Sequence, residues 1–338
     1  MRRCLGWLCC LLLWQGMALA DRVPLSARYG VGDRYMEVRL IGTVRLDRRD
    51  IDGVDLSELS GLAWDADEGL FYAVSDEGGL FHLRPEFEKG RLVGVHAVAG
   101  YPLRGHKGRP LRSEKRDAEG LALVKADNGI RGDTELMVSF EVWPRLRRYA
   151  PTGQWLGKVK LPRALKGRKH YDSLNHALET VAVHPRYGIL TAPERPMKGA
   201  PQAQVRVYES TGEGWAFHRA PHPKASMVGM DVLSDGSLLV LERAYSSMLE
   251  PLVVYVRRVW LTPECRIAAG GLCHTQLLAR FSSGEGWLLD NFEGLTRYGQ
   301  DAFCMVSDDG RHWFQRTLLS CFRLEVRPTA PPTPADPR

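Results

Sequence analysis

Short apolar runs along the chain repeatedly end in a small residue, a spacer and an acid. The first such run is Val74–Glu77, and four similar runs follow it. The acids that end these runs form one column of positions: Glu77, Glu141, Glu194, Glu242 and Asp309. They recur at roughly 50 to 65 residues, the spacing expected of four-stranded blades arranged in an array. The pattern therefore predicts one supersecondary unit repeated five times.

A second column of motifs precedes the acids by 13 to 22 residues. Its members open an apolar strand in each repeat: Ser60–Ala63, Glu119–Ala122, Glu179–Ala182, Gly229–Val232 and Glu293–Thr296. Turns rich in Asp, Gly or Asn follow these strands, and such residues tolerate the positive φ of tight hairpins. Each repeat is therefore expected to begin with a hairpin and to continue with two further strands.

The repeats predict an all-β fold, a β-propeller of five four-stranded blades. The fifth repeat runs out after a third strand at Leu318–Glu325. The β-rich segment Tyr35–Leu46 precedes the first repeat, so we expect it to supply the missing strand. Closing the ring in this way removes exposed sheet edges. The alternative is six shorter blades, if this count has merged two blades into one.

The first 20 residues have the pattern of an export signal. Arg2 and Arg3 precede the apolar stretch Leu5–Trp14, and Ala18–Ala20 provides a small-residue cleavage site. The apolar stretch is shorter than the ~20 residues that span a bilayer, and no later segment approaches that length without charges. We expect a signal peptide at 1–20, a propeller domain at 21–326 and a disordered Pro-rich tail at 327–338. The mature protein is expected to be an exported monomer, periplasmic or secreted by a bacterium.

Four cysteines stay in the chain after the signal is removed, and an even number in an oxidising compartment favours disulfides. Of three possible connectivities, Cys265–Cys273 would close a Gly-rich loop and Cys304–Cys321 would join two strands of one hairpin. Four buried thiols are the alternative, because free cysteine packs as a small hydrophobe.

Charge and motifs exclude several classes of function. Without Arg2 and Arg3 the net charge is +4, and no long run of one sign marks a nucleic-acid-binding arm. The chain has no Gly-x-Ser-x-Gly elbow, no phosphate-binding loop and no zinc-type Cys/His spacing. A small molecule is therefore the expected partner, rather than a nucleic acid.

Hairpin topology predicts where the acids lie. The start of the first strand and the end of the second lie at the same end of an antiparallel hairpin, so up to eight carboxylates should meet at one mouth of the ring. They are Glu77, Glu119, Glu141, Glu179, Glu194, Glu242, Glu293 and Asp309. Crowded carboxylates must be protonated, paired with cations or bound to metal. Calcium, which takes about 6 to 8 oxygen ligands, is the expected metal. Hydrogen bonds that fasten one blade to the next are the alternative role for each acid.

Two basic connections enter the innermost strands from the same end. They span residues 101–118 and 160–177, and an anionic substrate would be held by some of their side chains. The candidates are Arg104, Lys107, Arg109, Arg116, Arg168, Lys169 and His176. A solvated face is the alternative for each Lys or Arg, and a hydrogen-bonded strand-end histidine is the alternative for His176.

Ordered blade motifs extend over Ser57 to Asp309. They are Glu58–Leu62 with Ala73–Glu77, Asp117–Leu121 with Ser139–Glu141, Asn175–Glu179 with Ala192–Glu194, Asp235–Gly236 with Leu241–Arg243, and Asn291–Leu295 with Ser307–Asp309. In these motifs the chain resembles the esterase-like phytase family of exported bacterial β-propeller proteins. The fourth repeat departs from the pattern, because Gly229 stands where three others have Glu and Asp231 is displaced by two positions.

The resemblance implies hydrolysis of a phosphorylated or otherwise anionic ester, by analogy with calcium-dependent propeller phytases. The general base would be Glu119 or Glu179, since acids of the innermost strands are the best shielded from water. A propeller of the cell envelope that binds a ligand or partner without turnover is an alternative. A lactonase-like propeller with one deeply buried metal is a second alternative.

Overall fold

The structure is a computed structural model of the chain, and it describes residues 20–245, 250–310 and 315–325. The tail predicted at 327–338, and the signal peptide predicted at 1–20 apart from Ala20, lie outside these residues, so both stay predictions. No described helix is long and apolar enough to cross a membrane.

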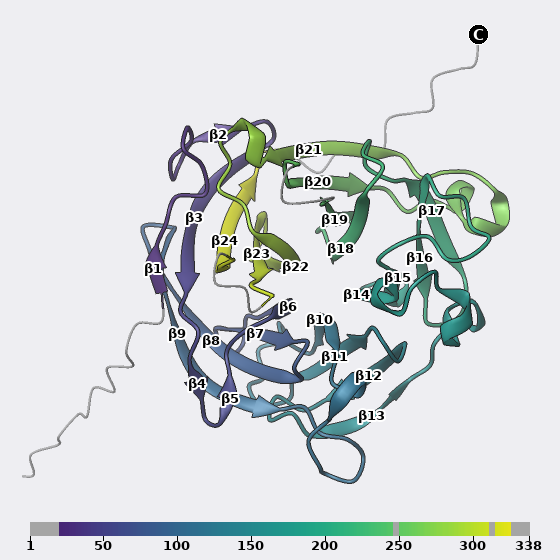
Figure 1. The fold of residues 1–338 in the computed structure, drawn as a ribbon, viewed down its shortest axis with the longest axis horizontal. Helices are drawn as coiled ribbons and strands as arrows, with labels where there is room; N and C mark the ends of the chain where they lie inside the picture. The colour runs from purple at the N-terminus through teal and green to yellow at the C-terminus, as the bar shows by residue number, and fades with distance from the viewer. Residues whose placement is uncertain (1–19, 246–249, 311–314, 326–338) are drawn as a thin grey trace, which may run out of the picture.

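Five antiparallel sheets stand around a central axis (Figure 1). The first blade is β6 (Leu59–Asp65), β7 (Leu70–Ser75), β8 (Gly79–Glu88) and β9 (Arg91–Pro102). The second is β10 (Ala118–Val124), β11 (Glu135–Phe140), β12 (Arg145–Tyr149) and β13 (Trp155–Val159). The third is β14 (Leu178–His184), β15 (Gly188–Pro193), β16 (Gln204–Glu209) and β17 (Gly214–His218). The fourth is β18 (Ala225–Val232), β19 (Leu238–Ala244), β20 (Val253–Val259) and β21 (Thr275–Ser282).

The fifth blade is built from both ends of the chain. It contains β22 (Asn291–Tyr298), β23 (Ala302–Asp308), β24 (Thr317–Leu324) and β3 (Val38–Leu46). Strand β3 pairs with β24 in antiparallel register, with Leu46 opposite Thr317 and Val38 opposite Leu324. Strands β1 (Ala20–Arg22) and β2 (Arg34–Tyr35) pair with the free side of β3. The five-bladed propeller and its closure by an N-terminal strand are thus confirmed, and the six-blade alternative is wrong.

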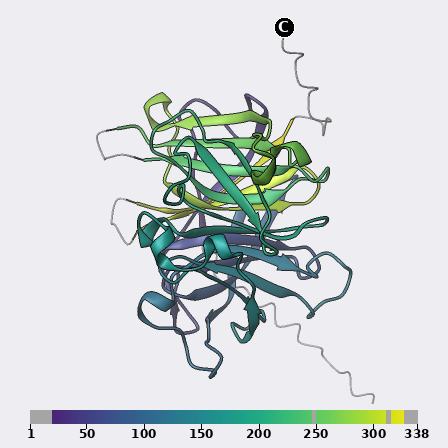
Figure 2. The same cartoon turned by 90° about the vertical axis from the view of Figure 1, so that its right-hand side faces the viewer.

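The remaining elements are short and lie in connections. The two-stranded ribbon β4 (Asp50–Ile51) and β5 (Val54–Asp55) precedes the first blade. Within the described residues seven 3-10 turns interrupt the loops: η1 (Ser113–Lys115), η2 (Arg163–Leu165), η3 (Arg168–His170), η4 (Leu174–His176), η5 (Pro263–Cys265), η6 (Ile267–Ala269) and η7 (Ser283–Glu285). In the side view the loops project from both faces of the ring (Figure 2). Three of these turns belong to the connection before β14, one of the predicted basic loops.

The hydrophobic core lies between neighbouring blades rather than within one of them. One cluster joins Phe71 and Phe81 of the first blade to Val306 and Leu319 of the fifth. Another joins Trp215 of the third blade to Val240 of the fourth. Because each sheet buries both faces against its neighbours, the strands are apolar along most of their length. The ring therefore becomes stable only when adjacent blades are in place.

Glycines of the second motif column let the innermost strands approach one another at the axis. A Cβ atom on Gly61 would lie 2.4 Å from the carbonyl oxygen of Glu119, and one on Gly120 would lie 2.7 Å from Cα of Thr180. The space left on the axis amounts to about 10 Å³, room for about one water molecule. The channel is therefore almost closed at this level.

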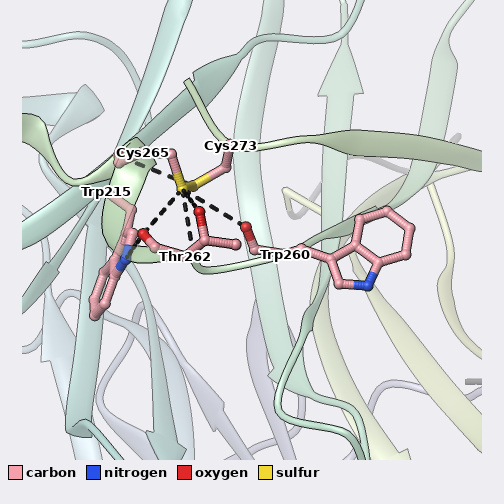
Figure 3. Close-up of a disulfide and its surroundings, with 5 residues drawn as sticks. All are labelled: Trp215, Trp260, Thr262, Cys265 and Cys273. Carbon is pink, nitrogen blue, oxygen red and sulfur yellow. Dashed lines mark hydrogen bonds between the residues drawn. A yellow bond between two sulfur atoms is a disulfide. The ribbon is translucent and has the colours of Figure 1, made fainter. Parts of the chain in front are cut away.

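The structure contains both predicted disulfides, Cys265–Cys273 and Cys304–Cys321, and the alternative of four free thiols is wrong. Cys304 and Cys321 stand opposite each other on β23 and β24, so their bond joins two strands of the closing blade. The other bond closes the loop between β20 and β21, and this loop contacts the third blade (Figure 3). There the indole Nε1 of Trp215 donates to the Thr262 carbonyl oxygen at 3.1 Å, and the Cys273 amide donates to that of Ala216 at 2.7 Å.

Replacing Gly61 with alanine tests the packing at the axis. The added methyl group collides with backbone of the second blade, and we expect the free energy of unfolding to fall by about 1 to 3 kcal/mol, as in overpacked cores. Denaturant unfolding followed by tryptophan fluorescence measures the change. Gly157→Ala on the outer strand β13 is the control, because its nearest contact is an arginine side chain at 3.6 Å. Equal stability of the Gly61 variant and the control would contradict this account.

Candidate functional site

Every innermost strand carries a β-bulge at the same place. The pairing register between first and second strand shifts after Leu59, Ala118, Leu178, Met227 and Phe292. The residue that follows each of these in the bulge is Ser60, Glu119, Glu179, Val228 or Glu293. Bulges re-aim a side chain out of the regular pleat. The repeated motif therefore has two parts, a bulged residue at the mouth and, in four blades, a glycine at the axis.

The pairing also shows which residue of the second strand is equivalent in each blade. Leu59 pairs with Ser75, Ala118 with Phe140, Leu178 with Pro193, Met227 with Glu242 and Phe292 with Ser307. The next residue at the mouth is therefore Asp76, Glu141, Glu194, Arg243 or Asp308. In the first, fourth and fifth blades this position lies one residue away from the predicted acid. The spacing of residues in the sequence could not show this offset of one residue.

Three groups of carboxylates meet where these positions converge. In each group the oxygen atoms lie within 4.8 Å of one another: Asp76, Asp117 and Glu119; Glu119, Glu179 and Glu293; and Glu141, Glu179 and Glu194. Glu119 and Glu179 belong to more than one group, so the seven residues form one acidic cluster. The predicted convergence of Glu119, Glu179 and Glu293 at one end of the ring is present in the structure. Their roles as base or metal ligand stay predictions.

Burial perturbs the acids strongly. It raises the pKa of Glu119 and Glu179 well above the usual range, and nearby carboxylates, first Asp76 and Glu194 respectively, add to the effect. Burial together with Asp117 raises the pKa of Glu141 to about 9, and burial together with Glu293 raises that of Asp308 to about 7. Burial is also the chief cause that raises the pKa of Asp76, Asp117 and Glu293.

Glu119 and Glu179 differ from the other cluster acids in having, among the described residues, neither a hydrogen-bond donor nor a cation within ion-pair distance. Each is only 6% exposed. Within the described residues no donor reaches either carboxyl group, whereas the Glu141 carboxylate accepts from the Ala177 amide at 3.1 Å. A buried carboxylate without a donor is costly unless a proton or a cation neutralises it. These two side chains therefore indicate a place for a cation within the cluster.

Arg243 is the cation that the chain itself brings to the cluster. Its side chain is 15% exposed, and its Nη1 lies 2.6 Å from Oε1 of Glu293 while Nη2 lies 3.7 Å from Oε1 of Glu194. It also donates to Oδ1 of Asn291. Burial disfavours the charged form, but Glu293 and Glu194 outweigh it, so the pKa of Arg243 is raised.

Three predicted ligands have other partners and do not join the three carboxylate groups. Glu77 accepts from Nη2 of Arg116 at 2.7 Å. Glu242 is fully buried, lies 2.6 Å from Nη1 of Arg257 and accepts from the Ala220 amide at 2.8 Å. Asp309 accepts from the Glu58 amide at 3.1 Å and from the Thr317 hydroxyl at 3.2 Å. Glu77 and Asp309 thus bond to connections that lead into the next blade, whereas Arg257 lies on β20, in the same blade as Glu242.

The basic loops contribute fewer side chains to the mouth than predicted. His176 Nε2 lies 3.8 Å from Oε2 of Glu194, and burial lowers the pKa of His176 although Glu194 opposes this. The Arg168 guanidinium lies 4.7 Å above the Trp143 ring. Arg104 donates to Gly108 within its own loop. The other three candidates are exposed: Lys107, Arg109 and Lys169.

The sequence analysis missed four residues of this mouth: Asp76, Asp117, Arg243 and Asp308. Asp117 stands two positions before Glu119 in the Asp-Ala-Glu-Gly-Leu motif, and that spacing could have indicated it. No spacing in the sequence indicated Arg243, because only the pairing of Met227 with Glu242 shows that it is equivalent to the acids of the other blades. The displaced Asp231 lies towards the other mouth, where it accepts from the Arg297 amide at 2.6 Å.

Comparison with known proteins gives one family match. The model of the family Phytase-like, described as "Esterase-like activity of phytase", matches residues 54–310. No curated protein matches the chain. Among solved structures, one entitled "Structure of Dos1 propeller" is similar, with 10% sequence identity, 85% of this chain and 75% of that chain covered, and a TM-score of 0.33. The fold assignment above therefore rests on the strand pairing.

The raised carboxyl pKa values predict a pH-dependent stability in chelator. The folded state holds protons that the unfolded chain releases near pH 4, so stability is fully present below about pH 4 and is lost as pH rises through about 7 for Asp308 and about 9 for Glu141. We expect the free energy of unfolding, measured with denaturant at several pH values, to fall over this window.

Glu141→Gln should reduce the slope in the upper part of that window, because the amide does not titrate and its oxygen can still accept from the Ala177 amide. Glu86→Gln, on the exposed part of β8, is the control. A free energy that rises with pH in chelator would contradict the buried, proton-holding cluster.

Proposed function

The chain belongs to this phytase-like family, and from that premise we propose that it is an exported hydrolase of a phosphorylated or otherwise anionic ester. We further propose that activity depends on a divalent cation, with calcium as the expected ion. The two disulfides accord with export to an oxidising compartment, the periplasm or the medium.

The observation that carries the proposal is the pair of buried carboxyl groups without donors, Glu119 and Glu179. The possible metal-ligand atoms around them in the described residues are carboxylate oxygens, with the imidazole Nε2 of His176 3.8 Å from Oε2 of Glu194. Such a donor set suits a hard cation such as Ca²⁺ and not zinc, which prefers sulfur and nitrogen in structural sites. The residues that would hold the ion are Asp76, Asp117, Glu119 and Glu141, which leaves Glu179 free to act as the base. Bound there, a cation supplies positive charge that polarises the ester and the attacking water.

The chain's own side chains would do the rest. Glu179 is the better choice for the base that takes the proton of the attacking water. Burial and nearby acids raise the pKa of Glu179, and Arg243 counts among the groups that oppose this rise. Arg116 and Arg168, at the rim, would bind oxygens of the anionic substrate. The nearly closed axis below the cluster keeps bulk water from entering from the other face.

A second candidate function is a propeller that binds an anionic ligand without turnover. The contacts that the rim arginines already make favour this function, because Arg116 pairs with Glu77 and Arg168 lies over the Trp143 ring. A substrate phosphate would have to compete with these contacts.

Hydrolysis of p-nitrophenyl phosphate in calcium buffer tests the proposed function. We expect turnover that is lost when the ion is chelated and restored when calcium is added back. Glu179→Gln should lower kcat by about 10² to 10⁴, the usual contribution of a general base, while the thermal midpoint in calcium stays near that of the unmodified protein. Glu86→Gln is the matched control.

Calcium-dependent stability with no turnover of phosphomonoesters, phosphodiesters or lactones would favour the binding propeller. Turnover that survives exhaustive chelation would contradict the dependence on a cation. Full activity of Glu179→Gln would exclude this residue as the base.

A further inference from the structure

The fourth blade departs from the other four in the sign of the charge that it brings to the mouth. At its bulge it has Val228, and at the equivalent position of its second strand it has Arg243. At this second-strand position the other blades have Asp76, Glu141, Glu194 and Asp308. The fourth blade therefore contributes a guanidinium where its neighbours contribute carboxylates.

Arg243 holds the acids of the blades on either side. Through its two terminal nitrogens it contacts Glu293 of the fifth blade and Glu194 of the third, and it donates to Asn291. Asn291 Nδ2 in turn donates to Glu293 at 2.9 Å and to Asp308 at 3.2 Å. One positive charge thus neutralises this side of the cluster through a connected set of hydrogen bonds, the condition under which buried charges are tolerated.

On the opposite side of the cluster the cations lie further away: Arg145 and Arg116 act on Asp117 without forming an ion pair with it. Asp76 accepts from the Ser60 hydroxyl, and Asp117 accepts from the Val142 amide at 3.1 Å. Among the described residues, no Lys, Arg or His lies within ion-pair distance of Asp76, Asp117 or Glu119. The oxygens of these three lie within 4.8 Å of one another, and Glu119, only 6% exposed, accepts no hydrogen bond from the described residues.

We propose that Arg243 occupies the place of a second cation in this mouth, and that a divalent cation binds off the axis, on Asp76, Asp117 and Glu119. This inference rests on the cation dependence in the proposed function and adds where the ion lies and how many bind. Because the blades are similar, the mouth could hold a cation on either side of the axis. The guanidinium fills one of them, so the other is left for calcium.

Calcium titration of the folded protein by isothermal calorimetry tests the proposal without reference to activity. Arg243→Gln removes the built-in charge and leaves Glu194 and Glu293 without their partner, so we expect this variant to bind one more calcium ion per chain than the unmodified protein. Arg243→Lys keeps the charge and should bind the original number. Thermal unfolding in calcium and in chelator shows whether each variant is folded during the titration.

A second pair of variants tests the position of the ion. Asp117→Asn should raise the calcium Kd by on the order of tenfold, because affinity follows the number of charged ligands. Asp301→Asn, an exposed residue paired with Arg323 on the far part of the fifth blade, is the control and should leave the Kd unchanged.

The outcomes separate this inference from the proposed function. An unchanged stoichiometry for a folded Arg243→Gln variant overturns the inference even if the protein is a calcium-dependent hydrolase. An unchanged Kd for Asp117→Asn overturns the off-axis position. Calcium binding with the expected stoichiometries but no ester hydrolysis supports the inference and contradicts the hydrolase. Absence of calcium binding in the unmodified protein overturns both.

Discussion

The close approach of the five innermost strands at the axis is the constraint on which the rest of this structure depends. In four blades a glycine stands where a side chain would strike the backbone of the next blade, as at Gly61 and Gly120. Next to these positions the strand bulges and turns the preceding side chain towards one mouth. The glycine and the neighbouring bulge therefore allow the core to close and bring the carboxylates close to one another. In the third blade, Thr180 takes the glycine position and its carbonyl accepts from the Thr191 hydroxyl.

Because the carboxylates are crowded, the pKa of each acid at the mouth depends on acids from several blades. Desolvation is the largest cause of the raised pKa of Glu119, Glu179 and Glu293, and each of them is raised further by acids from other blades. Such a cluster is stable only with protons, an arginine or a metal ion nearby. Arg243 meets part of that need, and the unequal distribution of its contacts makes a nearly five-fold arrangement asymmetric. Asymmetry of this kind is what a ligand site in a repeat protein needs, since identical blades would offer identical positions.

The periphery of the molecule holds the ring in this arrangement. Strand β3 pairs with β24 of the last blade, and the Cys304–Cys321 bond joins β24 to β23. The loop closed by Cys265–Cys273 ties the fourth blade to the third. Buried pairs such as Glu242 with Arg257 fasten the strands further out. These contacts explain why several acids of the repeated pattern belong to the scaffold rather than to the mouth.

The sequence by itself predicted the propeller, its closing strand and the convergence of Glu119, Glu179 and Glu293, and it favoured five blades over six and the two disulfide pairs that the structure contains. These features follow from periodicity, strand propensity and hairpin topology, which are local properties or count along the chain. Only the tertiary structure decided that Asp76, Arg243 and Asp308, rather than Glu77, Glu242 and Asp309, face the mouth. The physical reason is that side chains alternate between faces of a strand, so a shift of one residue in pairing exchanges them. That shift is set at the bulges by packing against the next blade, which no single repeat encodes.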